Sequence, residues 1–151
     1  QLHVVFVLDQ TDVYFGICGD DDRYIPVVLA PEFEKLLSHG PFLREMGSRF
    51  LMTAAAYRNA AGIGSYAHRY IGCLKTEDMD LGLYDIYDDR SADQIRVMKQ
   101  TQHVFDKAMD LYEKGYYYEA KNMYAMILRE NPRDMAARYY IFRCEELQKT
   151  K

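Results

Sequence analysis

The sequence changes its hydrophobic period at Ser91, and this change limits the folds that are open to the chain. Before it, short runs of β-branched and aromatic residues alternate with turn residues, a pattern typical of strands. After it, apolar residues recur at the 3.6-residue spacing of amphipathic helices. We therefore expect an α+β protein with a β-rich part at residues 1–90 and an all-α part at residues 91–151.

The β-rich part contains a series of strand-like segments separated by turn signals. We expect strands at residues 2–8, 13–19, 24–29, 49–52, 68–74 and 81–87, the last two forming a hairpin. A helix is expected at residues 31–38, because Pro31 stands in its first turn, where the missing N–H costs nothing. The glycines and proline that follow, at residues 40–47, indicate an irregular stretch.

The all-α part carries clear start and stop signals for three helices. Ser91 and Gln94 have the spacing of a capping box, and Gly115 ends the first helix. A second helix begins near Tyr117 and ends before Asn131 and Pro132. A third is expected at residues 134–147.

These helices resemble a tetratricopeptide repeat, a helical hairpin of 34 residues with fixed small and aromatic positions. The matching residues are Ala108, Ala120, Tyr124 and the closing Pro132, whereas Val104 and Lys107 depart from the pattern. One repeat plus a capping helix is short of the about three units that stacked repeats need. The helices are therefore expected to dock on the β-rich part or on a second chain.

The resemblance also implies a recognition surface on the first helix. The positions that line the groove in stacked repeats are Gln102, Phe105, Met109, Tyr112 and Glu113. We expect them to bind a protein partner; the alternative is that they simply bury against the β-rich part.

The β-rich part resembles the C-terminal portion of a class III adenylate or guanylate cyclase domain, whose sheet is derived from a ferredoxin-like fold. The similarity lies in the order of its pieces: a strand, the turn at residues 9–11, a strand with Gly16 and Gly19, an acidic turn, a strand and the helix at residues 31–38. Residues 69–72 and 83–87 resemble the closing hairpin of that family.

The resemblance implies a site that has lost its chemistry. Glu34 stands where the family has an Asn that positions the ribose, and Ser38 where it has an Arg that neutralises phosphate charge. Val27 occupies a base-reading position and cannot hydrogen-bond a purine edge. Lys75 is the only base near the expected phosphate Lys, and the family's metal-binding aspartates belong to segments that precede residue 1. No catalytic residue, cofactor or metal site is expected.

Charge and cysteine content bear on the partners. The net charge of −4 argues against nucleic acid or an anionic membrane as the main partner. Three separated cysteines, with no metal-binding spacing, indicate free thiols in the cytoplasm.

The open edge of the first strand suggests self-association. If the chain begins partway through the cyclase fold, the strand at residues 4–8 has an unpaired apolar edge, and natural proteins rarely leave such an edge open. We therefore expect the strand to pair with another copy, giving a homodimer or a strand-exchanged dimer, and we expect further domains upstream.

The sequence thus predicts a non-catalytic cyclase-like module with tetratricopeptide-like helices that acts in assembly or regulation within a larger signalling protein. One alternative is the C-terminal part of an active cyclase whose catalytic groups lie upstream or on a partner chain. The other is a peptide-binding adaptor.

Overall fold

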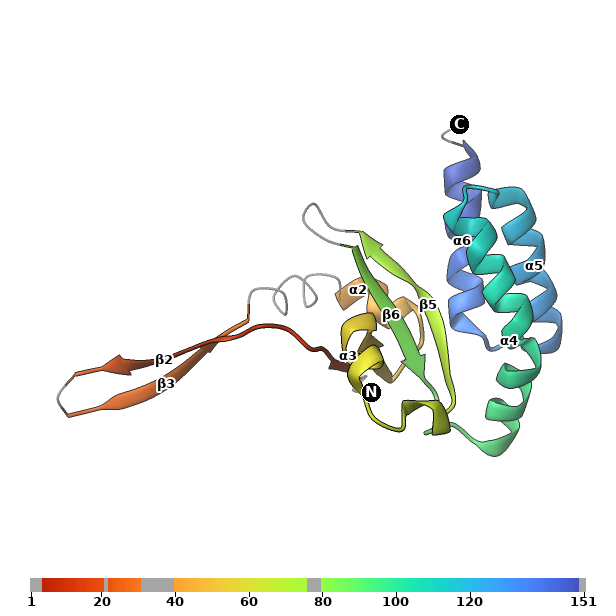
Figure 1. Cartoon of the computed structure of the whole chain (residues 1–151). Helices are drawn as coiled ribbons and strands as arrows, with labels where there is room; N and C mark the ends of the chain where they lie inside the picture. Colours follow the sequence, from red (N-terminus) through yellow and green to blue (C-terminus); the bar gives the residue numbers. More distant parts are fainter. Residues whose placement is uncertain (1–3, 21, 31–39, 76–79, 150–151) are drawn as a thin grey trace.

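The computed structural model describes residues 4–20, 22–30, 40–75 and 80–149, and it has an α+β architecture (Figure 1). A four-stranded mixed sheet forms the centre, a two-stranded hairpin projects from one side, and three long helices stand on the other. The expected helix at residues 31–38, and with it Glu34 and Ser38, falls outside the described residues.

The sheet has the order β1-β4-β6-β5. Strand β1 (Phe6–Leu8) runs parallel to β4 (Phe50–Thr53). Strand β6 (Asp80–Ile86) is antiparallel to both β4 and β5 (His68–Lys75), so the expected hairpin of the last two strands is confirmed. The first strand is shorter than expected: its ladder covers only Phe6 to Leu8, because the short β4 offers partners only from Phe50 to Met52.

The projecting hairpin consists of β2 (Tyr14–Gly19) and β3 (Tyr24–Leu29), which pair in an antiparallel ladder over their whole length. The backbone of Asp20 and Arg23 closes the turn, and the Asp20 carboxylate accepts from the Arg23 N–H. The strands expected at residues 13–19 and 24–29 are thus present, and we call this hairpin the arm.

The stretch expected to be irregular contains a short helix, α2 (Gly40–Glu45). This correction has a local cause, because Pro is favoured in the first turn of a helix and Gly47, with φ 65°, ends the segment. Leu43 and Met46 bury this turn against the core. The helix α3 (Ala54–Asn59) follows β4 and is capped by the Thr53 hydroxyl, and a 3-10 turn η1 (Ile63–Ser65) leads into β5.

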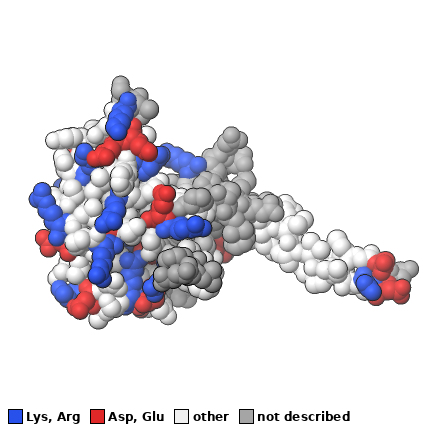
Figure 2. Space-filling view, turned by 180° about the vertical axis from the view of Figure 1, so that it is seen from behind, with Lys and Arg blue, Asp and Glu red and all other residues white. Residues whose placement is uncertain are grey.

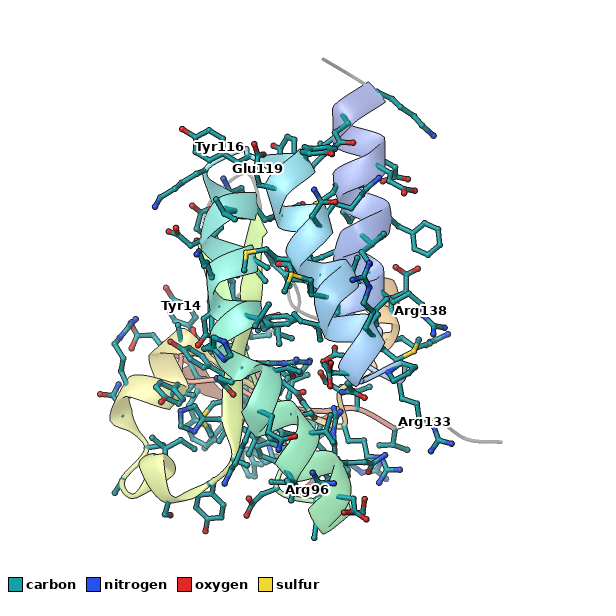
Figure 3. The ribbon with its side chains drawn as sticks, turned by 90° about the vertical axis from the view of Figure 1, so that its right-hand side faces the viewer. Tyr14, Arg96, Tyr116, Glu119, Arg133 and Arg138 are labelled. Atoms are coloured by element: carbon teal, nitrogen blue, oxygen red, sulfur yellow. The ribbon has the colours of Figure 1, made fainter. Side chains whose placement is uncertain are left out.

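The long helices are α4 (Ala92–Glu113), α5 (Tyr117–Glu130) and α6 (Met135–Lys149). Ser91 and Gln94 form the predicted capping box, and Gly115, with φ 83°, ends the first helix as expected. In Figure 3, Tyr116 and Glu119 mark the end of the bundle where α4 turns into α5, and Arg133 and Arg138 lie near the turn from α5 to α6.

The three helices pack against the sheet rather than standing apart from it. One buried cluster contains Leu51, Ile71 and Leu83 from the strands together with Phe105 and Tyr124 from the helices. The expectation that the helices dock on the β-rich part is confirmed, and the main hydrophobic core crosses the boundary at residue 90.

Candidate functional site

The cyclase-like position Val27 lies on β3 in the arm, opposite Gly16 on β2, where its side chain is half-buried. Lys75 stands far from it in the chain, at the exposed end of β5. Of the three substituted family positions, Val27, Glu34 and Ser38, the structure describes only Val27. Among the described residues, no cluster of polar side chains surrounds Val27.

The five expected partner-binding residues of α4 divide into an inner and an outer group. Phe105 and Met109 are buried in the shared core, and Gln102 is half-buried, accepting a hydrogen bond from the Tyr87 hydroxyl at 3.0 Å. Tyr112 and Glu113, at the end of the helix, reach the surface. Their binding role stays a prediction, but only the outer pair is placed to meet a partner.

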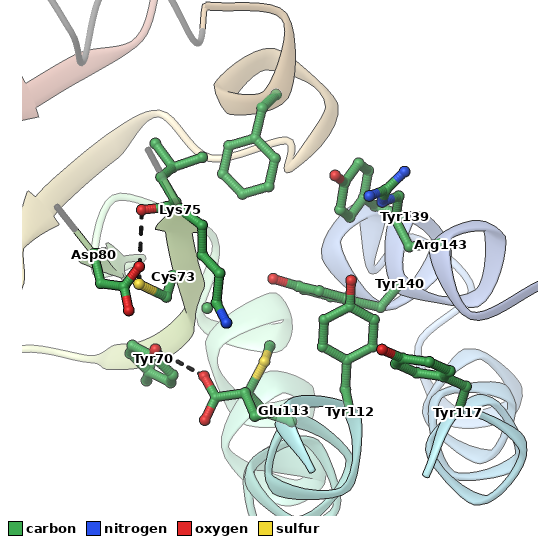
Figure 4. Close-up of a pocket in the computed structure, with 14 residues that line it drawn as sticks. Tyr70, Cys73, Lys75, Asp80, Tyr112, Glu113, Tyr117, Tyr139, Tyr140 and Arg143 are labelled. Carbon is green, nitrogen blue, oxygen red and sulfur yellow. Dashed lines mark hydrogen bonds between the residues drawn. The ribbon is translucent and has the colours of Figure 1, made fainter. Parts of the chain in front are cut away.

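Tyr112, Glu113 and Met109 line a cavity of about 840 Å³ between β5 and the helices (Figure 4). We call it the β5 cleft. One wall is strand β5 from Tyr70 to Lys75; the opposite wall is built from α4, α5 and α6. Its helical wall is rich in tyrosine and includes Tyr112, Tyr117, Tyr139 and Tyr140.

The base of the cleft is fixed by one glycine and one tyrosine. The Tyr140 hydroxyl donates to the backbone carbonyl of Ile71 at 2.6 Å. This approach requires Gly72, because a Cβ at that position would collide with the same hydroxyl, and its φ of 114° disfavours any side chain. Tyr140 therefore satisfies one edge carbonyl of β5 and closes the cleft below it.

The charged groups of the cleft balance one another. Lys75 and Asp80 lie on the strand side of the cleft, and Arg143 and Glu113 lie on the helical side, so each side has one cation and one anion. Glu113 accepts a hydrogen bond from the Tyr70 hydroxyl at 2.9 Å, and burial together with this carboxylate raises the pKa of Tyr70. Burial also raises the pKa of Tyr112, Tyr139 and Tyr140, so the phenols remain protonated donors at neutral pH.

A second polar group, a buried ion pair, fixes the helices to the sheet. The Arg69 guanidinium on β5 donates to both carboxylate oxygens of Asp134, at 2.7 and 3.1 Å, and both side chains are almost fully buried. The guanidinium also lies over the Phe105 ring, 4.0 Å from its centroid. Asp134 in turn accepts from the Ala137 N–H at the start of α6.

This ion pair was not predicted from the sequence. Its partners are 65 positions apart, and no local pattern joins a charged residue in a strand to one before a helix. The only signal was Arg69 itself, a cation within a run that otherwise reads as a buried strand. The pair helps to hold the three helices against the sheet, although they contain only one repeat. Its role is therefore structural rather than catalytic.

The arm is the most unusual surface of the molecule. Every described residue of β2 is exposed, and so is every one of β3 except the half-buried Val27. The exposed apolar side chains include Tyr14, Phe15, Ile17, Tyr24, Ile25, Val28 and Leu29, each with more than half of its surface open to solvent. Figure 2 shows the arm as an uncharged rod with charges gathered at its tip.

No family model, curated protein or solved structure matches the chain. Within the described ranges, no helix is long and apolar enough to cross a membrane. The same ranges contain no group of three His, Cys, Asp or Glu side chains that could hold a metal ion.

Proposed function

We propose that the chain is a non-catalytic, cyclase-like interaction module of the cytoplasm that assembles with a second copy of itself through the arm. The single observation that carries the proposal is the exposure of large apolar side chains on both faces of the arm. A two-stranded hairpin is marginal in water by itself, and contiguous apolar surface of this kind marks an interaction site.

The cyclase-like part of the proposal draws on the sequence. Glu34, Ser38 and Val27 replace the groups that would position a nucleotide, so the module acts through assembly or regulation and not through nucleotide turnover. The tetratricopeptide-like helices belong to the same module, because they share its core.

The choice of a second copy as the partner rests on the open strands. Strand β1 lies at one end of the sheet, with Phe6 and Leu8 partly exposed, and within the described residues its outer side pairs with no strand. The arm adds two further unpaired edges. Two identical chains have the same unpaired strand edges, so the edges of one can pair with those of the other. Closed two-fold symmetric dimers are the commonest homo-oligomers.

The test is the molar mass of the protein in solution, measured by size exclusion with light scattering. We expect about twice the 17.7 kDa of the chain at micromolar concentration, and the mass of one chain for Phe15→Asp in the arm. Phe142→Asp is the matched control, because Phe142 on α6 is exposed to nearly the same extent (62% against 67%) and should leave the dimer intact. A monomeric wild-type protein would refute the proposal.

The active-enzyme alternative has a separate test. The full-length protein is incubated with Mg²⁺ or Mn²⁺ and ATP or GTP. We expect no cyclic nucleotide. Production that is lost on changing Glu34 or Lys75 would contradict the non-catalytic assignment.

A further inference from the structure

The β5 cleft lies along the edge of its strand rather than over one face of the sheet. Successive residues of a strand point to opposite faces, so a cavity on one face would touch every second residue. This cavity touches Gly72, Cys73, Leu74 and Lys75 in unbroken sequence. The cavity also touches Tyr70, before the register shift between Tyr70 and Gly72, and Asp80 at the start of β6. Residues from both faces of β5 therefore meet one space, which places the cavity at the edge of this strand.

That edge carries backbone groups without a partner strand. Among the described strands, β5 stands at the end of the sheet and pairs with β6 alone. At Ile71 the edge carbonyl is satisfied by the Tyr140 hydroxyl, and from Gly72 to Lys75 the cavity lies between the strand and the helices. In the same stretch, the Leu74 carbonyl accepts only a long bond from the Cys73 thiol, at 3.7 Å. A strand edge with no partner strand in a half-buried cleft favours the addition of a further strand, because buried backbone groups need hydrogen-bond partners.

The chemistry of the cleft favours an uncharged, aromatic or aliphatic strand. Its two cations and two anions leave no net charge to attract a charged segment, and tyrosine rings form most of the wall opposite β5. Tyrosine combines a large apolar contact area with a hydroxyl that can reach a backbone carbonyl.

One segment of the same chain has these properties. Strand β2 has the sequence YFGICG and contains no charged residue, and its outer edge pairs with no strand among the described ones. Strand β3 is less suited, because Pro26 lacks an N–H and disrupts a ladder on an open edge. Six residues of β2 span ~20 Å, more than the four residues of β5 that face the cleft.

We propose that β2 of one copy enters the β5 cleft of a second copy and pairs with the edge of β5. This inference rests on the proposed self-association and names the surface that receives the arm. Two such contacts related by a two-fold axis make a closed dimer, whereas contacts that do not close would produce open chains.

The native cysteines provide a direct test in the wild-type protein. Cys18 is exposed on β2, Cys73 lines the cleft, and the third thiol, Cys144, is buried. Treatment of the dimer with a short bis-maleimide should link Cys18 of one copy to Cys73 of the other, identified by mass spectrometry of the peptides. Cys18→Ser and Cys73→Ser should each abolish this link without changing the molar mass. A dimer without a Cys18–Cys73 link, including one with Cys18–Cys18 links alone, would overturn the proposal.

A mixing experiment separates this inference from the proposed function. Phe15→Asp disables the arm and keeps the cleft; Cys73→Arg places a long cation in the cleft and keeps the arm. Each variant alone should be monomeric, and an equimolar mixture should recover dimers that contain one intact arm in one intact cleft. If Cys73→Arg remains dimeric, the arm binds elsewhere and only the present inference fails. If the wild-type protein is monomeric, both proposals fail.

Discussion

The arm and the body of this molecule (residues 4–8, 40–75 and 80–149) are stabilised in different ways. In the body, one buried cluster joins strands and helices, and a fully buried ion pair links β5 to the start of α6. In the arm, a ladder of backbone hydrogen bonds joins two strands that have no fully buried side chain between them. The body therefore has the features of a stable domain, and the arm has those of a strand pair that needs a second surface.

The contrast shows where self-association would act. A substitution in the body changes the free energy of unfolding of each chain, because it removes contacts that every chain makes internally. A substitution on the arm should leave that free energy nearly unchanged and alter the association instead. Measurements of stability on the Phe15→Asp variant, which we expect to be monomeric, with and without a second change, separate the two effects.

The largest loss of stability is expected for Asp134→Ala. This change leaves the Arg69 guanidinium buried without its carboxylate, and breaking a buried pair in this way costs about 3–5 kcal/mol. Urea denaturation measures the loss. The matched control is Asp110→Ala, which removes the exposed partner of Lys114 and should have little effect, because water and salt screen an exposed pair. Equal costs for the two variants would show that the buried pair does not hold the body together.

Gly72→Ala should have the next largest effect, because the new Cβ meets the Tyr140 hydroxyl at a backbone φ of 114°. We expect a loss of about 2–3 kcal/mol from strain and displacement. Tyr140→Phe alone should cost about 1–2 kcal/mol, since the Ile71 carbonyl loses its donor. The double variant should cost less than the sum of the two, because the hydroxyl that the methyl group meets has been removed. Strict additivity would contradict the packing described for the base of the cleft.

Two buried carboxylates should respond to pH in opposite directions. Burial alone would raise the pKa of Asp134, but the charge and hydrogen bonds of Arg69 and the Ala137 N–H hold it below its ordinary value. Burial raises the pKa of Asp85 despite the nearby Arg90 and Arg69. A lowered pKa contributes stability above the unfolded-state value of about 4 that is lost as the pH falls through the folded-state value. A raised pKa makes the folded state more stable as the pH falls from neutral.

The loss of unfolding free energy caused by Asp134→Asn should therefore stay constant from pH 7 to about 4 and become smaller in more acidic solution. The loss caused by Asp85→Asn should instead become larger as the pH falls from 7 to about 4. Urea titrations at a series of pH values test both slopes. Parallel slopes for the two variants would show that the assigned directions of the pKa shifts are wrong.

The sequence was sufficient for the local features of this fold. Ser91 and Gln94 predicted the capping box, Gly115 predicted the end of the first helix, and residues 13–19 and 24–29 were predicted as strands, although not as a pair. In each case the residues that determine the structure are near one another in the chain. The short helix α2 was missed because its proline and glycines were taken as breakers, although Pro is favoured at a helix start.

The sequence could not determine what covers each apolar face. The period of α4 placed Phe105 and Met109 on one face with Tyr112, but it did not show that the sheet covers the first two and leaves the third beside a cleft. The same is true of the Arg69–Asp134 pair and of the cleft, which bring together segments far apart in the chain. These features depend on tertiary packing, for which a local pattern carries no signal.

The smallest effect on each chain's stability is expected in the arm, and it tests the comparison most directly. Ile25 is 63% exposed on β3, and Ile71 is fully buried on β5. On the monomeric background, Ile25→Ala should change the free energy of unfolding by less than about 0.5 kcal/mol, whereas Ile71→Ala should cost about 2–5 kcal/mol. In the dimer that we propose for the wild-type protein, the unfolding midpoint should rise with protein concentration, because a partner that binds only the folded chain stabilises it by mass action, and the same arm substitution should weaken this dependence. A large cost of Ile25→Ala in the monomer would mean that the arm packs against its own body, and the distinction drawn between the two regions would then be wrong.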